Sequence, residues 1–419
     1  MNKRIVANSL WMMSEKIVAI FGLIFVTSFV AKYVGPEIFG SIALAMSIFQ
    51  LIQLVAQLGT DVLIFKRLSR NKQSGINLIN VTVPIRMFVY MALSFPVLLF
   101  YIAKTDYSAS YYLIAALIAC FIQSMDVYSI YYDATLNSKV NTFVNVIGLV
   151  FSLLLRWGIA FLKLDPLWLC LPIILAPLIP CLIRYFYYIN NTNKKNISHK
   201  FKRKYVRYII GAGSAFVISS LSVAIYTRLS LLMLGFFDGE SAVGIYSVAA
   251  TLATSWAFIL NSLVTSSLPS IFSENNDENT LNRAAKLNLI VVGVSIPIIL
   301  GVYFVGEWFI KTFYGDMYML SYHPLLILTF STLFGSLGTV SARIIAKYSG
   351  YSFLSKKMFL VAIFSFIVNF LLIMKLSIIG AAVANVLTQF FSLTLFNYPF
   401  KNGVVLKLHL KTIFFSFKR

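Results

Sequence analysis

Long apolar runs without charge are the feature of this sequence that most limits what it can fold into. Examples are residues 17–31, 87–103, 144–155 and 358–374, and no polar stretch long enough for a water-soluble domain separates them. A helix of about 20 such residues crosses the hydrocarbon core of a bilayer. Only 12% of the residues are charged, against about a quarter in a typical soluble domain. The sequence therefore predicts an all-α, polytopic integral membrane protein.

Breaks between the apolar runs predict about twelve membrane-spanning helices. Turn-forming pairs such as Gly35-Pro36, Asp165-Pro166 and Asp238-Gly239 fall in the connections. We expect helices over residues 5–33, 38–65, 79–103, 109–135, 141–163, 166–189, 206–236, 242–272, 284–311, 319–346, 354–375 and 378–400.

Lysine and arginine are distributed unequally between the two sets of loops. If the N-terminus lies in the cytoplasm, most loop cations lie on that side, and the outer loops hold few. Positive charge marks cytoplasmic loops, so both termini are expected in the cytoplasm. The same rule accounts for the net charge of +21, and no nucleic-acid partner is expected. The three cysteines and three histidines lack metal-ligand spacing, so neither a metal site nor a cofactor is expected.

A basic connection after the sixth predicted span divides the chain into two similar halves. We expect an N-terminal six-helix bundle at 1–190, a basic cytoplasmic linker at 191–206, a C-terminal six-helix bundle at 207–400 and a basic cytoplasmic tail at 401–419. The first turn of each half carries a related sequence, Gly35-Pro36-Glu37 in one and Gly239-Glu240 in the other. Parallel repeats of this kind place the transport site of a membrane protein between the halves.

Polar residues recur at helical spacing on seven of the predicted spans. The second span carries Gln50, Gln53, Gln57 and Asp61, the fourth Gln123, Asp126, Asp133 and Asn137, and the fifth Asn141, Asn145, Gly148, Ser152 and Arg156. Lipid cannot solvate these groups, so each polar face must contact another helix or water. Hydroxyl groups and glycines can serve helix packing alone. The charged members favour a shared water-filled cavity.

Five basic residues inside the spans are candidates for binding an anionic substrate: Lys16, Arg86, Arg156, Arg228 and Arg343. Guanidinium groups bind phosphate oxygens in a bidentate manner and remain charged. A basic cavity within an apolar shell suits an anionic head group attached to a lipid tail. The alternative for Arg86 and Arg343 is that their side chains extend to the membrane surface.

Three stretches resemble a known family: residues 8–16 (NSLWMMSEK), 30–40 (VAKYVGPEIFG) and 376–385 (LSIIGAAVAN). They are similar to the O-antigen and polysaccharide flippases of the multidrug/oligosaccharidyl-lipid/polysaccharide exporter superfamily. The length, the twelve spans and the basic middle connection agree with the same resemblance.

The resemblance implies a flippase of the bacterial inner membrane. Such proteins move undecaprenyl-diphosphate-linked O-antigen or similar repeat units from the cytoplasmic to the periplasmic leaflet by alternating access. Coupling to H⁺ or Na⁺ is implied, and the acidic candidates for it are Glu15, Asp61 and Asp126. The glycan polymerase and the chain-length regulator are possible partners.

Two other functions stay open at this point. One is a cation-coupled multidrug exporter of the same superfamily, which would be expected to carry acids rather than arginines in the outer halves of its spans. The other is a membrane glycan polymerase or glycosyltransferase. Because the outer loops are short and no nucleophile or metal motif is present, we do not expect an enzyme.

Overall fold

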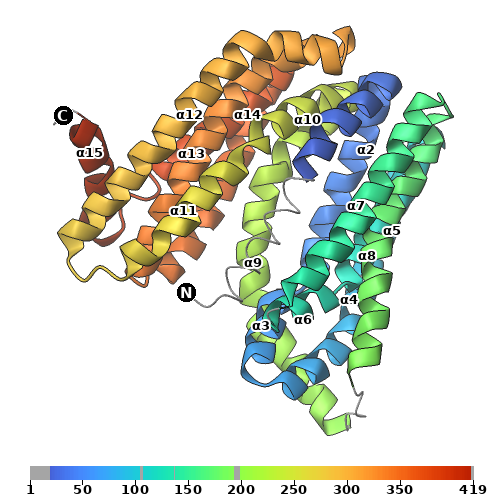
Figure 1. The fold of residues 1–419 in the computed structure, drawn as a ribbon, viewed down its shortest axis with the longest axis horizontal. Helices are drawn as coiled ribbons and strands as arrows, with labels where there is room; N and C mark the ends of the chain where they lie inside the picture. Colours follow the sequence, from blue (N-terminus) through green and yellow to red (C-terminus); the bar gives the residue numbers. More distant parts are fainter. Residues whose placement is uncertain (1–18, 104–106, 136, 193–198, 417–419) are drawn as a thin grey trace. The chain divides into compact units, whose positions relative to one another are not determined.

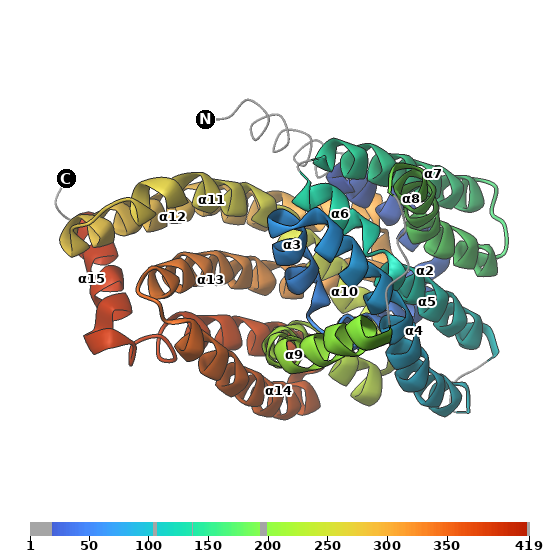
Figure 2. The ribbon, with the colours of Figure 1, turned by 90° about the horizontal axis from the view of Figure 1, so that it is seen from below.

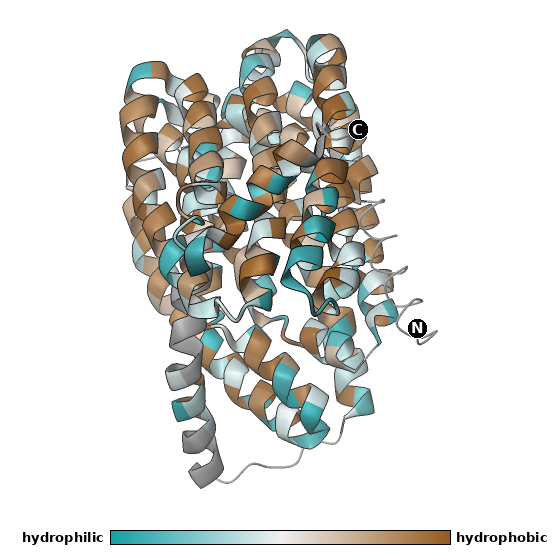
Figure 3. Ribbon diagram, turned by 90° about the vertical axis from the view of Figure 1, so that its left-hand side faces the viewer, coloured by the Kyte–Doolittle hydropathy of each residue, from teal (hydrophilic) through white to brown (hydrophobic). Residues whose placement is uncertain are grey.

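The computed structural model describes residues 19–103, 107–135, 137–192 and 199–416 (Figure 1). Within these residues, nine helices are long and apolar enough to cross a membrane, and a shorter apolar helical stretch covers Ala224–Phe237. Large apolar side chains on the helices remain exposed, including Phe88, Phe236 and Phe304. Figure 3 shows hydrophobic residues along the outer faces of the long helices. Such faces require lipid, and the predicted all-α membrane fold is confirmed.

The chain forms two compact units, Met1–Ala224 and Ile225–Arg419. The division between them falls inside one long helix, α9, which begins at His199 within the predicted basic linker. The described part of the first unit contains η1 (Gly22–Thr27), α2 (Ser28–Ala56), α3 (Thr60–Arg70), α4 (Lys72–Ile102), α5 (Tyr107–Met125), α6 (Tyr128–Ala134), α7 (Ser138–Phe161), η2 (Pro166–Leu169), α8 (Cys170–Asn191) and the start of α9 (His199–Phe237).

The second unit begins with the end of α9. It continues with α10 (Gly239–Ser255), α11 (Ala257–Phe272), α12 (Asp277–Phe313), η3 (Asp316–Ser321), α13 (Tyr322–Lys347), α14 (Tyr351–Leu393), η4 (Lys401–Gly403) and α15 (Val404–Ser416). Helix α13 packs between α12 and α14, and α15 packs against α12 (Figures 1 and 2).

Two of the long helical segments each contain two predicted spans. The segment Ala19–Ala56 has 38 residues and Tyr351–Leu393 has 43, which is too long for one crossing of a core of about 30 Å. Each has one residue with non-helical backbone angles, Gly35 with φ 78° and Ser377 with φ 51°. These residues coincide with the predicted turns. Counted with these divisions and the apolar end of α9, the described helices correspond to the twelve predicted spans, and residues 5–18 of the first span lie outside the described residues.

The turn at Ser377 brings the two parts of α14 into close contact. A Cβ atom built on Gly380 would lie 2.1 Å from the carbonyl oxygen of Leu372. No side chain fits in that space, so glycine is required here. Gly380 belongs to the LSIIGAAVAN stretch, and the close approach gives this part of the motif a physical reason.

Candidate functional site

Two membrane spans of the first unit are interrupted within the polar stripes. The second span breaks between α2 and α3, where Leu58 and Gly59 have left-handed φ angles of 50° and 60°. The fourth span breaks between α5 and α6, at Asp126 and Val127. Backbone groups freed by such breaks must find new partners, because lipid offers none.

Arg86 of α4 supplies partners at both breaks. Its Nη1 donates to the carbonyl oxygen of Ser124 at 3.0 Å, which satisfies an acceptor at the end of α5. Its Nε donates to Thr60 Oγ1 at 3.0 Å, and its Nη2 pairs with Asp61, both at the start of α3. The Arg86 side chain is 1% exposed, so it does not extend to the membrane surface. The alternative of a surface-seeking Arg86 is wrong, since the guanidinium ties two broken helices together.

A second arginine, Arg184 of α8, lies on the other side of the break in the fourth span. Its Nε donates to Asp126 Oδ1 at 3.2 Å, and its Nη2 forms an ion pair with Asp126 Oδ2. Its Nη1 donates to Asn145 Oδ1 of α7 at 2.6 Å. The side chains of Arg184 and Asp126 are only 6% and 10% exposed. Such a pair is stable in a low-dielectric region only when both charges are well hydrogen-bonded, as they are here.

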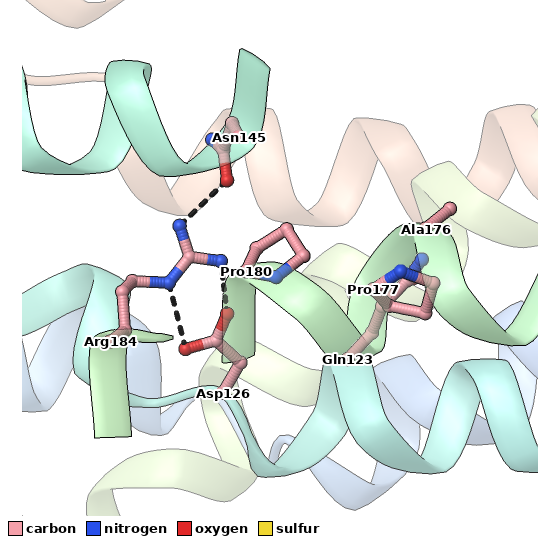
Figure 4. A pocket seen from close by; sticks show the side chains of 7 residues that line it. All are labelled: Gln123, Asp126, Asn145, Ala176, Pro177, Pro180 and Arg184. Atoms are coloured by element: carbon pink, nitrogen blue, oxygen red, sulfur yellow. Dashed lines mark hydrogen bonds and ion pairs between the residues drawn. The ribbon is translucent and has the colours of Figure 1, made fainter. Parts of the chain in front are cut away.

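The Arg184–Asp126 pair forms part of a small pocket, which Figure 4 shows from close by. Its volume is about 210 Å³, and its lining consists of Gln123, Asp126, Asn145, Ala176, Pro177, Pro180 and Arg184. In a regular helix the carbonyl oxygen of Ala176 would accept from the N–H of residue 180, but Pro180 has no N–H. The pocket's side chains thus present a carboxylate, a guanidinium and two amides. This mixture of donors and acceptors suits a polyhydroxylated or phosphorylated group.

Two of the predicted polar stripes meet in this pocket. Gln123 and Asp126 come from the fourth span and Asn145 from the fifth. Two other members of the fifth stripe, Gly148 and Ser152, serve helix packing instead. Ser152 donates to the carbonyl oxygen of Pro172 at 3.0 Å, and a Cβ on Gly148 would lie 2.5 Å from Pro180. Gly148 and Ser152 of this stripe therefore fit the helix-packing alternative, and Asn145 fits the alternative of a binding cavity.

The other candidate residues occupy different surroundings. Arg156 is half-buried on α7, and no described carboxylate pairs with it. Arg228 is half-buried on α9. Arg343 is exposed one turn before the end of α13, which agrees with a side chain that reaches the membrane surface. Glu15 and Lys16 lie outside the described residues.

Sequence reasoning missed Arg184, although a signal was present. It is the one charged residue in Cys170–Asn191, where the apolar run would otherwise read as an ordinary span. A single arginine in such a run is costly unless a partner meets it.

The second unit contains a polar cluster without charge. Ser230 of α9 donates to Asn369 of α14 at 2.8 Å, and Ser331 of α13 donates to Asn385 at 2.6 Å. Tyr246 of α10 hydrogen-bonds to both Ser230 and Asn385. The cluster joins four helices through neutral groups, so it stabilises their packing and presents no charge to a ligand.

Comparisons with known proteins give consistent similarities. Residues 5–276 match the family model described as polysaccharide biosynthesis protein. The teichuronic acid biosynthesis protein TuaB of Bacillus subtilis (strain 168) is 31% identical over 108 residues, which are 25% of this chain. The match spans 22% of that relative's length.

Solved membrane transporters share the fold over nearly the whole chain. The lipid II flippase MurJ, in an inward closed conformation, has a TM-score of 0.70 at 15% identity and covers 98% of this chain and 92% of its own. An inward-facing multidrug resistance MATE family transporter of the MOP superfamily has a TM-score of 0.72 at 14% identity, with 100% of both chains covered. At these identities the likeness concerns the fold.

Proposed function

The chain belongs to the polysaccharide biosynthesis protein family, and from that premise we propose that it is a flippase for lipid-linked saccharide repeat units. The proposed substrate is an undecaprenyl-diphosphate-linked O-antigen or similar repeat unit, moved from the cytoplasmic to the periplasmic leaflet of the inner membrane. Alternating access is the proposed mechanism, with H⁺ or Na⁺ as the coupling ion.

The observation that carries the proposal is the pocket around Arg184 and Asp126. Carboxylates and amides bind sugar hydroxyls as acceptors and donors, and arginine binds phosphate oxygens. A drug exporter that selects apolar cations would be expected to present an unpaired carboxylate to them, whereas the carboxylate of Asp126 is already neutralised by Arg184.

The pocket is smaller than the substrate that we propose. Its 210 Å³ lie below the range of about 300–1,000 Å³ that drug-sized ligands occupy. We therefore propose that it receives one sugar or phosphate group at a time, while the polyprenyl chain remains in lipid. A hydroxyl or phosphate oxygen of the substrate would compete with Asn145 for the guanidinium of Arg184.

The remaining candidate residues belong to the same proposal. Arg156 and Arg228 are proposed to attract the diphosphate, and Arg156→Ala and Arg228→Ala should each reduce export while membrane insertion continues. Lys16 and Arg343 are proposed as weaker contributors. Glu15, Asp61 and Asp126 are proposed as the groups that exchange the coupling ion.

The experiment that tests the function is a clean deletion of the gene followed by complementation. The deletion strain should lack the corresponding surface glycan and accumulate its lipid-linked unit on the cytoplasmic side. Arg184→Gln should fail to restore the glycan at native expression. Arg70→Gln, a change to an exposed arginine at the end of α3, is the matched control and should restore it.

Three results would reject this function. A deletion strain that displays normal glycan would remove the premise of saccharide transport. Drug sensitivity on deletion and drug resistance on overexpression, with unchanged glycan, would identify a multidrug exporter instead. A change in glycan chain length with normal translocation would point to a polymerase.

A further inference from the structure

The C-terminal helix α15 has three distinct faces. Val405 and Leu408 are fully buried on the first. Leu406, Leu410, Ile413 and Phe414 are exposed on the second and lie within one helical face at 100° per residue. Lys407 and Lys411 follow on the third, directly beside the apolar residues.

The buried face joins α15 firmly to the second unit. Leu408 belongs to the same hydrophobic cluster as Leu281 and Ala285 of α12. Asn288 of α12 donates to Thr412 at 3.2 Å, and Lys411 donates to Asn282 at 2.9 Å. These contacts place α15 along the first three turns of α12, so its exposed face has a defined direction.

The exposed residues of α12 change from charged to apolar at the level where α15 lies. In its early turns the exposed residues are charged or polar, namely Asp277, Glu278, Asn279, Arg283 and Lys286, and from Ile290 to Val305 they are apolar. The change from Lys286 to Ile290 marks the passage from the polar membrane surface into lipid. Because α15 contacts α12 from Glu278 to Asn288, it lies at this boundary.

The exposed apolar face is too hydrophobic for water and has no described protein partner. Ile413 and Phe414 are 55% and 63% exposed. Amphipathic helices with lysines beside such a face lie in the interface of anionic membranes, with the apolar side about 5–10 Å into the head-group layer. We propose that α15 is a lipid-surface helix that binds anionic phospholipid through Lys407 and inserts Leu410, Ile413 and Phe414 into the leaflet beside α12.

The test measures where the exposed face lies in a membrane. The full chain, with Cys120, Cys170 and Cys181 replaced by alanine, is given one new cysteine by Leu410→Cys or Ile413→Cys and labelled with an environment-sensitive fluorophore. It is reconstituted in vesicles of phosphatidylethanolamine and phosphatidylglycerol. Asn275→Cys, in the exposed connection between α11 and α12, is the matched control.

Labels at 410 and 413 should be quenched by lipids brominated near the head group and protected from aqueous iodide. The label at 275 should show the reverse. Replacing phosphatidylglycerol by phosphatidylcholine, or adding Lys407→Gln, should move the first two labels toward the aqueous pattern, since one lysine at an anionic surface shifts such an equilibrium by about fivefold.

Two outcomes would overturn the proposal. Iodide quenching at 410 and 413 equal to that at 275 would show that water covers the face. Protection from both quenchers, increasing with protein density in the vesicles, would show that a second copy of the chain covers it. Phe414→Cys provides a third position if either labelled variant is poorly produced.

Discussion

Single residues in the first unit show how a membrane protein holds charge. Arg86 and Arg184 each pair with a carboxylate, and each also donates to at least one uncharged acceptor on another helix. Full coordination of this kind offsets the cost of removing a guanidinium from water. The buried charges are therefore stabilised by their protein partners, because the surrounding lipid cannot solvate them.

Removing only one member of the Arg184–Asp126 pair should destabilise the protein. Asp126→Ala leaves a buried guanidinium without its carboxylate, and we expect a loss of about 3–5 kcal/mol in the free energy of unfolding. The double variant Asp126→Asn with Arg184→Gln removes both charges and should recover most of this loss. Thiol-dye labelling of the buried Cys120 during thermal unfolding measures the effect.

The same double variant separates stability from transport. It should remain defective in glycan export, because the guanidinium is absent. If its stability equals that of Asp126→Ala, the ion pair is not the source of the loss.

We predict that the docking of α15 depends on pH through His409. Its ring contacts Ser341 and Tyr398, each at 3.3 Å, and burial lowers the pKa of His409 from 6.5 to about 4. The unfolded chain then binds a proton more readily than the folded one, so stability falls as pH falls. The stability that the buried neutral ring of His409 contributes should be complete above pH 6.5 and lost progressively between pH 6.5 and pH 4.

The measurement is the thermal stability of the purified protein across this pH range, compared with His409→Gln. The variant should lose less stability on acidification than the unchanged protein. Equal slopes for the two proteins would contradict a role for this histidine.

At the scale of the elements, the turns and helix breaks show the similarity between the two halves more clearly than the regular helices do. Gly35 and Gly239 open the second and eighth spans with φ angles of 78° and 82°. The related sequences at these two turns thus have a common conformational reason, since glycine adopts positive φ without strain. The second and eighth spans are also both interrupted, the latter at Trp256 between α10 and α11.

Gly380→Ala should weaken the contact between the two parts of α14. The added methyl group would meet the Leu372 carbonyl at 2.1 Å, and overpacking of this kind costs about 1–3 kcal/mol. Gly338→Ala is the matched control, because nothing lies within 4 Å of a Cβ at that position of α13. The control should be neutral or stabilised by up to about 1 kcal/mol.

Thermal unfolding of the two variants in the same detergent gives the comparison. Equal midpoints for Gly380→Ala and Gly338→Ala would mean that the turn at Ser377 relaxes to accept the methyl group.

For the whole molecule, the distribution of basic loops predicts its orientation in the membrane. A C-terminal fluorescent protein should be bright, and alkaline phosphatase fused at Lys163 should be active, because that enzyme works only outside the cytoplasm. Fusion of the phosphatase within residues 193–198 should be inactive. An active phosphatase at the C-terminus would place that end outside and reject the predicted topology.

Much of the architecture was predictable from the sequence, including the turns at Gly35 and Ser377. The transfer of a residue into lipid depends mainly on its own side chain, so summed hydropathy locates the spans. The interruption of the fourth span was not predicted, and residues 109–135 were expected as one helix. Nothing local requires a break at Asp126, since the carbonyl of Ser124 that the break leaves free finds its partner in Arg86 of α4.

The sequence by itself determined that this chain folds in lipid, approximately where the turns between its spans lie, and to which family it belongs. Only the tertiary structure decided which charges meet, because Arg184 and Asp126 are 58 positions apart and their attraction depends on distance in space. It also decided that Arg86 joins two broken helices. Pair energies of this kind depend on how the helices pack, and residue order alone does not specify that packing.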